Sequence, residues 1–300
     1  MSLSVVITSH NNASLIEDCL KSVHDIADEI IVVDNESTDN TVKIVKKHTK
    51  KIYSHQNNPS ALNQAKNYGF TKAKSDWILS LDPDERLSPE LAKEISSIIN
   101  YQLSIINYSA YQFPRKNIIF GKWIEHGLWY PDQQIRLFKN GQGKFAEKHN
   151  HEKLQVQGEV RELSGHLIHY NYTSVTQYVD KINHMYSGNE ATEFIRSGKK
   201  ALWYDAIRMP ASDFLTNFFA REAYKDGLHG LVLSIMQAFY TFVVFAKIWE
   251  RQGFTEYNHQ KFLSESLHEI NQKQQESRYW HQQIQPNLFR RLRNLFLSRG

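Results

Sequence analysis

The chain has 300 residues, which suits one large domain or an ordinary domain with an appendage, and it can bury a core without disulfide staples. Its single cysteine, Cys19, excludes an internal disulfide and favours a reducing compartment. The formal net charge of +4 is mild, but the last fifteen residues hold four arginines and no acid. That tail indicates an anionic partner, either lipid headgroups or nucleic acid, or else a solvated basic segment. The start opens directly into a β-branched run, so we expect no signal peptide.

The first hundred residues alternate strand and helix patterns. Strands are predicted at 3–10, 29–35, 51–54 and 77–82, and helices at 14–23, 38–48, 60–74 and 89–100. Ser14 and Glu17 have the spacing of a capping box, and Ser88 followed by Pro89 marks the start of the fourth helix. The alternation predicts an α/β fold with right-handed crossovers, and the continuous apolar strands predict a mainly parallel sheet covered on both faces.

The rest of the chain changes character twice. Residues 101–172 contain strand-like pieces with scattered Gly and Pro, which predicts mixed or antiparallel structure continuing the same domain. From 173 the pattern is helical, and 230–249 is almost wholly apolar, close to the roughly 20 residues of a membrane-spanning helix. We expect this helix to lie in or against a membrane surface, with spanning and a buried core helix as the alternatives. The predicted regions are therefore 1–172, 173–250 and a polar, loosely packed helical tail, 251–300.

The polar residues of the first region stand where predicted strands end. In open α/β sheets, ligands bind beyond the carboxyl ends of the strands, so these side chains should converge on one rim. Two acids separated by one residue supply hard oxygen ligands, which suits Mg²⁺ or Mn²⁺ shared with substrate phosphates. The alternative is a Pro-Asp turn with solvated acids. The rim candidates are Thr8, Ser9, Asp34, Asp39, Asp82 and Asp84.

Four blocks, in this order, resemble family 2 glycosyltransferases of the GT-A fold. The blocks are SVVITSHNNASLIEDCLKSV, EIIVVDNESTDNT, ALNQAKNYGFTKAKSDWILSLDPDER, and WYPDQQIRLFKNGQGKF with HNHEKL. The resemblance is closest to the lipopolysaccharide core glucosyltransferase group, whose members use UDP-glucose. It covers roughly 1–172 and extends into the apolar helical region, which associates with membranes in that family. It implies a Rossmann-like, mixed but mainly parallel sheet with helices on both faces, followed by a C-terminal helical membrane-associating region.

The resemblance also implies roles for individual residues. Asp34 and Asp39 match positions that bind the nucleotide base and ribose, together with Thr8 and Ser9. Lys66 and Asn67 match positions near the nucleotide and diphosphate. Asp82 and Asp84 match the metal site, and Gln134 with Arg136 matches a donor- or acceptor-side motif. Glu152 matches the catalytic base, although Asn150 replaces a usual small apolar residue. Family members often have glycine where Glu36 and Asn40 stand.

The histidines and aromatics near the end of the first region allow several readings. His169 is expected to contact the diphosphate or the metal, because related GT-A enzymes use a late histidine. A zinc site among the histidines at 149, 151, 166 and 169 is the alternative. The segment WIEHGLWYP either forms an aromatic wall for a sugar acceptor or packs in the core.

The implied activity is an inverting transfer of a hexose, glucose by the closest group, from a UDP-sugar to a lipopolysaccharide-core or other lipid-linked glycan. The implied cofactor is Mg²⁺ or Mn²⁺. The implied location is the cytoplasmic face of a bacterial inner membrane, with the protein peripheral and without a nucleic-acid partner. Two rivals stay open. A haloacid-dehalogenase-like phosphatase also uses D-x-D, usually after its first strand. A non-catalytic sugar-nucleotide-binding membrane protein would need no base.

Overall fold

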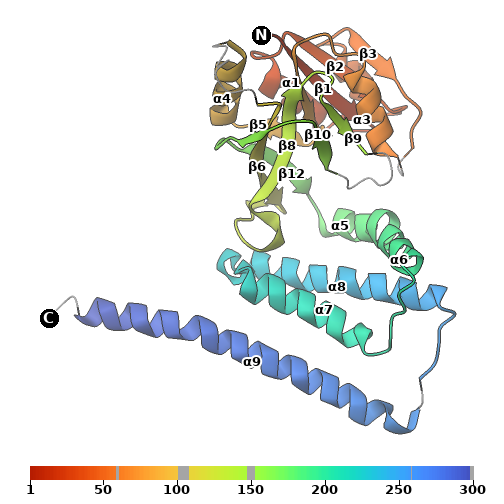
Figure 1. Ribbon diagram of the computed structural model, residues 1–300, viewed down its shortest axis with the longest axis vertical. Helices are drawn as coiled ribbons and strands as arrows, with labels where there is room; N and C mark the ends of the chain where they lie inside the picture. The colour runs from red at the N-terminus through yellow and green to blue at the C-terminus, as the bar shows by residue number, and fades with distance from the viewer. Residues whose placement is uncertain (59–60, 101–107, 147–152, 258, 298–300) are drawn as a thin grey trace. The chain divides into compact units, whose positions relative to one another are not determined.

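The computed structural model describes residues 1–58, 61–100, 108–146, 153–257 and 259–297, with side chains described up to residue 284. Its internal contacts divide the chain into two units (Figure 1). Unit 1 comprises Met1–Trp123 and Trp129–Thr173, and unit 2 comprises Ile124–Leu128 and Ser174–Gly300. The three-part organisation with boundaries at 172 and 250 stays a prediction.

Unit 1 is built around one mixed sheet in the order β3-β2-β1-β4-β8-β6-β12-β5, with β7 and β11 paired to β6 (Figure 1). Strands β9 and β10 pair with each other in a separate two-stranded sheet. The strands are β1 Leu3–Ser9, β2 Glu29–Asp34, β3 Lys51–Ser54, β4 Trp77–Leu81, β5 Glu85–Leu87, β6 Ala110–Ile119, β7 Lys122–Trp123, β8 Asp132–Lys139, β9 Gly143–Phe145, β10 Leu154–Val156, β11 Val160–Glu162 and β12 Leu167–Tyr172. The helices are α1 Ile16–Val23, α2 Thr41–Val45, α3 Leu62–Phe70 and α4 Pro89–Asn100.

The first four strands in the chain form the parallel half of the sheet. β1 pairs in parallel with β2 and with β4, and β2 pairs in parallel with β3. Every residue of β1, β2 and β4 is buried, which is why their sequences are continuous apolar runs. The register sets Ser9 opposite Asp34, so the carboxyl ends of β1 and β2 lie at the same edge. The predicted α/β architecture is confirmed here.

Helices cover both faces of the parallel half. Leu3, Val5 and Ile7 of β1 belong to a core cluster that also contains residues of α1 and α4. The intervening Val6 belongs to a second cluster with Phe70 of α3. This is the two-residue alternation expected of a strand with a core on each side.

Strands β6, β7, β8, β11 and β12, together with β5, form the mixed half of the sheet, as the sequence predicted for the segment after the first hundred residues. β8 runs antiparallel to both β4 and β6, whereas β12 runs parallel to β6 and antiparallel to β5. β5 is only three residues long, but its register places Glu85 opposite His169. The mixed half thus brings residues from distant segments against the end of β4.

The capping box predicted at Ser14 is wrong. Helix α1 begins at Ile16 after Leu15, and no side chain caps it. The amides of Leu15 and Ile16 both donate to the carbonyl of Asn12, so a backbone turn takes the position of the cap. The cap predicted for α4 is confirmed, because the Leu91 amide donates to Ser88 Oγ at 3.2 Å.

Unit 2 is helical, as the sequence predicted from 173 onward. Its long helices include α8, which is long and apolar enough to cross a membrane by length and composition, and α9, which contains the predicted polar helix. The α-helices are α5 Val175–Lys181, α6 Ser187–Arg196, α7 Asp205–Leu215, α8 Leu228–Arg251 and α9 His259–Leu297. The shorter helical turns are η1 Gly127–Trp129, whose last residue belongs to unit 1, η2 Ile182–Tyr186, η3 Thr216–Ala220 and η4 Ala223–Asp226.

A buried polar clamp in unit 2 holds the segment Ile124–Leu128. The carboxylate of Asp226 accepts from the amides of Glu125 and His126, at 3.3 and 2.9 Å. Asn217 Oδ1 accepts from the Leu128 amide at 2.8 Å. Because Asp226 is 4% and Asn217 1% exposed, these hydrogen bonds are shielded from water. The backbone of Ile124–Leu128 is therefore held by side chains from the helical part of unit 2.

Candidate active site

The first part of the site lies at the paired ends of β1 and β2. Ser9 and Asp34 are both buried, at 2% and 8% exposure. Asp34 Oδ2 accepts from the Ser37 amide at 3.1 Å. The other carboxylate oxygen, Asp34 Oδ1, and the Ser9 hydroxyl are buried without a hydrogen-bond partner among the described residues. Unsatisfied buried polar atoms are unfavourable, so a water molecule or a polar ligand that reached this pair would be stabilised by it.

The loop after β2 uses Asp39 to join two segments. Its carboxylate accepts from the Thr41 amide and hydroxyl and from the Ala13 amide. Desolvation alone would raise the pKa of Asp39, but these hydrogen bonds lower it below the ordinary value. Glu36, where family members often have glycine, takes a left-handed backbone with φ of 57°. The loop therefore keeps a glycine-like conformation without glycine.

Helix α3 presents Lys66 to the rim and Asn67 to β9. A Cβ on Gly69 would lie 2.6 Å from a methyl carbon of Val6, so only glycine allows the helix to approach the sheet this closely. Asn67 exchanges hydrogen bonds with the backbone of Phe145 in both directions, each at 2.9 Å. Asn67 therefore holds β9 against α3, and its predicted contact with a nucleotide stays a prediction.

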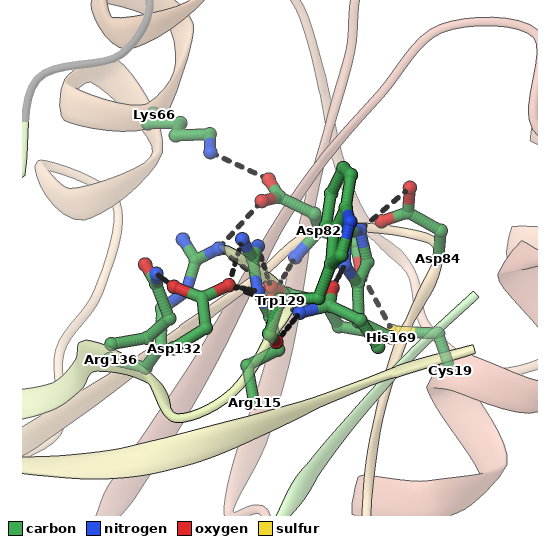
Figure 2. Close-up of polar contacts among 12 residues, drawn as sticks. Cys19, Lys66, Asp82, Asp84, Arg115, Trp129, Asp132, Arg136 and His169 are labelled. Carbon is green, nitrogen blue, oxygen red and sulfur yellow. Dashed lines mark hydrogen bonds and ion pairs between the residues drawn. The ribbon is translucent and has the colours of Figure 1, made fainter. Parts of the chain in front are cut away.

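Asp82 ends β4 between two cationic side chains, which Figure 2 shows reaching it from α3 and β8. Lys66 Nζ lies 2.6 Å from Asp82 Oδ1, and Arg136 donates to Asp82 Oδ2 at 2.8 Å. Burial would raise the pKa of Asp82, but Lys66 and Arg136 hold that pKa far below its usual range. Asp82 is therefore ionised, and either oxygen would have to leave a protein cation to reach a metal.

Glu85 is the buried centre of this network. It is 0% exposed and accepts from Arg136 at 2.7 Å, from Arg115 at 3.3 Å and from the Asp82 amide at 2.9 Å. Burial would lower the pKa of Arg136, but Glu85 and Asp82 raise it, so the guanidinium stays charged. Glu85 thus aligns the backbone of the D-x-D turn with the arginine of β8.

Asp84 lies beside His169 of β12 and not beside the lysine and arginine of Asp82 (Figure 2). Asp84 Oδ2 is 3.4 Å from His169 Nε2, and the Tyr170 amide donates to the Asp84 carbonyl at 2.9 Å. One carboxylate and one imidazole fit a divalent cation that takes its other ligands from phosphate and water. The described residues contain no group of three or more His, Cys, Asp or Glu side chains placed to hold a metal.

Three residues of the mixed half join the site without having been predicted. Asp132 of β8 accepts from Arg115 Nε at 2.7 Å and from Gln134 at 2.6 Å, and Arg115 and Asp132 are opposed in the sheet register. Asn117 of β6 contacts Asp132 and His169. The available signal was the polar pair Arg115 and Asn117, which lie two residues apart on the face of β6 that also carries Phe113 and Ile119.

Some predicted residues lie outside this network. Glu152, His149 and His151 fall outside the described residues, so the base and the zinc alternative stay predictions. His166 Nε2 is 3.1 Å from the Tyr130 hydroxyl, and their rings stack at 5.9 Å. The Trp123 ring packs edge-on against the rings of Tyr130 and His166. Two aromatic residues of the segment WIEHGLWYP therefore pack against each other. Its role as a wall for a sugar acceptor stays a prediction.

The single thiol lies behind the D-x-D turn. Cys19 Sγ donates to the Asp82 carbonyl at 3.5 Å, and Figure 2 shows it on the far side of the turn from Lys66. Burial, followed by the nearby carboxylates, raises the pKa of Cys19 well above its ordinary value. The thiol is therefore protonated and packs as a small apolar group.

Comparison with known proteins gives consistent matches. The model of Glycosyl transferase family 2 matches residues 4–154. An uncharacterized glycosyltransferase of Rickettsia typhi is 31% identical and spans 83% of this chain and 87% of its own length. The lipopolysaccharide core biosynthesis glycosyltransferase LpsC of Rhizobium meliloti is 24% identical over 84% of this chain and 93% of its own length. Among solved structures, S. aureus TarS 1-349 in complex with UDP-GlcNAc is 15% identical, with a TM-score of 0.43 over 86% of this chain and 93% of that chain.

Proposed function

This chain belongs to glycosyl transferase family 2, and we propose that it transfers a hexose, glucose in the first instance, from a UDP-sugar to a lipopolysaccharide-core or other lipid-linked glycan. The observation that carries the proposal is the order of groups along the rim. Unpaired polar atoms of Ser9 and Asp34 come first, then the Lys66–Asp82–Arg136 cluster, then the Asp84–His169 pair. A nucleoside requires polar partners such as the first pair, a diphosphate requires positive charge such as the second cluster supplies, and a metal-bound leaving group requires metal ligands such as the third pair.

The nucleotide would occupy the β1–β2 end of the rim. Asp34 Oδ1 is an acceptor that suits a ribose hydroxyl or a base N–H, and the Ser9 hydroxyl can donate or accept. We assign Thr8 and Asp39 to the same end, as the family resemblance implies. Lys66 supplies positive charge for the diphosphate, with Gln134 and Arg136 on the sugar side of the cluster.

A divalent cation, Mg²⁺ or Mn²⁺, would be held by Asp84 and His169. Bound there, it would neutralise charge that develops on the departing diphosphate. Asp82, which the family resemblance also places at the metal, keeps its own charge matched by Lys66 and Arg136. We therefore propose that Asp82 orients Lys66 toward the diphosphate in the complex.

The proposed reaction is a single displacement with inversion. A carboxylate takes the proton from the acceptor hydroxyl, the hydroxyl oxygen forms a bond to the anomeric carbon, and the bond from that carbon to the diphosphate breaks and leaves UDP. We propose Glu152 as the base. Asp132 is the second candidate, because it is a carboxylate within the described network and is 23% exposed at its side chain.

The lipid-linked acceptor is proposed from two observations. LpsC, a relative over most of its length, is named for lipopolysaccharide core biosynthesis. Helix α8 also exposes an apolar stripe whose members are spaced to lie on one face. Such a stripe suits a helix lying in the surface of the cytoplasmic leaflet. The stripe consists of Leu228, Ile235, Phe239, Phe242 and Trp249.

A donor screen tests the proposal. UDP-, GDP-, CMP- and dTDP-sugars are added to the full chain with and without Mn²⁺, and the unfolding temperature is measured, because a bound donor stabilises the folded state by mass action. UDP release is then assayed with core-truncated lipopolysaccharide as acceptor. We expect stabilisation by a UDP-hexose and acceptor-dependent UDP release. Phosphate release without sugar transfer would favour the phosphatase, and donor binding without turnover would favour the non-catalytic protein.

The two candidate bases are separated by matched substitutions. Glu152→Gln should lower kcat by about 10²-fold or more while leaving UDP affinity unchanged, since general base catalysis typically contributes 10²–10⁴-fold. Asp132→Asn should leave more activity than Glu152→Gln. The opposite ranking would assign the base to Asp132.

A further inference from the structure

Asn117 is a fully buried amide that touches both the predicted metal histidine and the segment entering β8. It is 0% exposed in the middle of β6. Its Oδ1 lies 2.7 Å from His169 Nδ1. Its Nδ2 donates to the Trp129 carbonyl at 2.7 Å and to Asp132 Oδ2 at 3.3 Å. All its side-chain contacts named here are therefore directional hydrogen bonds within unit 1.

The two acceptors around Nδ2 fix which way the amide points. Turning the amide over would set Asn117 Oδ1 against the Trp129 carbonyl and the Asp132 carboxylate, which are both acceptors. In that arrangement three buried acceptor oxygens would face one another with no hydrogen-bond donor among them. The free energy would rise by the desolvation penalty of buried acceptors that have no partner. The oxygen of Asn117 therefore faces His169, and an amide oxygen can only accept.

This orientation determines the tautomer of the imidazole. Because Asn117 Oδ1 accepts, His169 Nδ1 must carry a proton in order to make the 2.7 Å contact. In the neutral ring, Nε2 then has a lone pair, and it points toward Asp84 Oδ2 at 3.4 Å. Two lone pairs at that distance repel unless a metal cation or a proton lies between them. A carbonyl-type oxygen on the far nitrogen is also the usual support for a metal-binding histidine.

We propose that Asn117 is a positioning residue that keeps the proton of neutral His169 on Nδ1 and so presents the Nε2 lone pair to a divalent cation shared with Asp84. The proposal rests on the metal role assigned to His169 and Asp84 under the proposed function. It adds the residue that makes the imidazole a ligand and links that residue, through the Trp129 carbonyl, to the segment before β8.

The first test needs no substitution at Asn117. The metal-free chain is labelled with ¹⁵N-histidine and studied by NMR at about pH 9, well above the unperturbed histidine pKa of about 6.5. The His169 signals are identified by their loss in His169→Gln. We expect the proton on Nδ1 and none on Nε2. A proton on Nε2 would mean that Asp84 and not Asn117 sets the tautomer, and the proposal would be overturned.

The second test measures Mn²⁺ binding by electron paramagnetic resonance of the free ion. Asn117→Leu keeps the approximate size but removes the acceptor, and it should weaken Mn²⁺ binding by about 10- to 100-fold, the range for loss of an outer partner of a metal ligand. Asn117→Gln keeps both an amide oxygen that can accept from Nδ1 and an amide N–H that can donate to the Trp129 carbonyl, so it should retain clearly more Mn²⁺ affinity than Asn117→Leu. A purely structural role would weaken both variants alike, which would overturn the proposal.

Two control variants distinguish a failure of the proposed role of Asn117 from a failure of the metal role assigned to His169 and Asp84. Asn140→Leu removes an asparagine that also binds two backbone carbonyls, those of Ala73 and Ser75, and it should leave Mn²⁺ binding unchanged. His169→Gln should abolish tight binding. If His169→Gln weakens Mn²⁺ binding and Asn117→Leu does not, only the role of Asn117 fails. If His169→Gln binds Mn²⁺ as wild type does, the metal assignment fails as well. If Asn117→Leu does not fold, the tautomer measurement decides.

Discussion

Replacing Glu85 by Gln should destabilise unit 1 strongly while changing almost no volume. Glu85 is 0% exposed and accepts from Arg136 at 2.7 Å, Arg115 at 3.3 Å and the Asp82 amide at 2.9 Å. The neutral amide keeps one acceptor oxygen but leaves Arg136 with Asp82 alone. Removing one member of a buried ion pair typically lowers stability by 3–5 kcal/mol. Because Arg115 keeps Asp132 and is 20% exposed, we expect the low end, about 3 kcal/mol.

The assay is urea unfolding followed together with hydrogen exchange of individual amides. The exchange measurement isolates unit 1, since the Asp82 amide loses its charged acceptor and should exchange faster in Glu85→Gln. The matched control is Glu17→Gln, which removes an exposed pair with Lys21 at 3.3 Å and should lower stability by no more than about 0.5 kcal/mol. If Glu85→Gln also falls within about 0.5 kcal/mol of wild type, the argument that Glu85 anchors the D-x-D turn is refuted.

Three further outcomes follow from the same contacts. Ionised Asp82 contributes stability that is fully present above its unfolded pKa of about 3.9 and is lost as pH falls through its lower folded pKa. Lys66→Met should raise that folded pKa. Acid unfolding, followed by circular dichroism, should therefore begin at a higher pH than in the wild type. Asp34→Asn should weaken UDP binding by about 1.5–3 kcal/mol in calorimetry, because a charged acceptor is lost; unchanged affinity would remove Asp34 from the nucleotide site. Phe239→Glu with Phe242→Glu should reduce sedimentation with anionic lipid vesicles, whereas equal sedimentation would argue against docking by α8.

In the first hundred residues, the sequence pattern predicted strands β1–β4 and helices α1–α4, because each of these elements depends on local pattern. The strands at 29–35 and 77–82 end within one residue of β2 and β4, since an apolar run stops where burial stops. The error at Ser14 has the opposite cause. Whether a serine caps a helix depends on the turn before it, and that turn is fixed by the Asn12 carbonyl and by Asp39 from another loop.

Without the family resemblance, which named Lys66, Arg136 and His169, the sequence pattern alone predicted site residues only at the ends of strands. Ser9 and Asp34 are the last residues of buried parallel strands and Asp82 directly follows one, so the topology of an open α/β sheet is enough to bring them together. Arg115 and Asp132 act through a pairing of β6 with β8 that no local pattern specifies, because antiparallel register across a long connection depends on the whole fold. Glu85 follows Asp82 and Asp84 closely in the sequence, but it is fully buried in β5, which pairs with β12, and no local pattern indicates that burial.

The two carboxylates of the D-x-D turn are therefore chemically different, although the sequence presents them alike. Asp82 has a lysine on one oxygen and an arginine on the other, and its charge is matched within the protein. Asp84 lies next to the imidazole of His169, whose proton we propose is held on the far nitrogen by Asn117. A cation arriving at the turn would compete with Lys66 and Arg136 for the oxygens of Asp82, whereas Asp84 lies beside the imidazole of His169. Under the proposed function, the second carboxylate is therefore the metal ligand, and the first keeps Lys66 at the rim where we propose that the diphosphate binds.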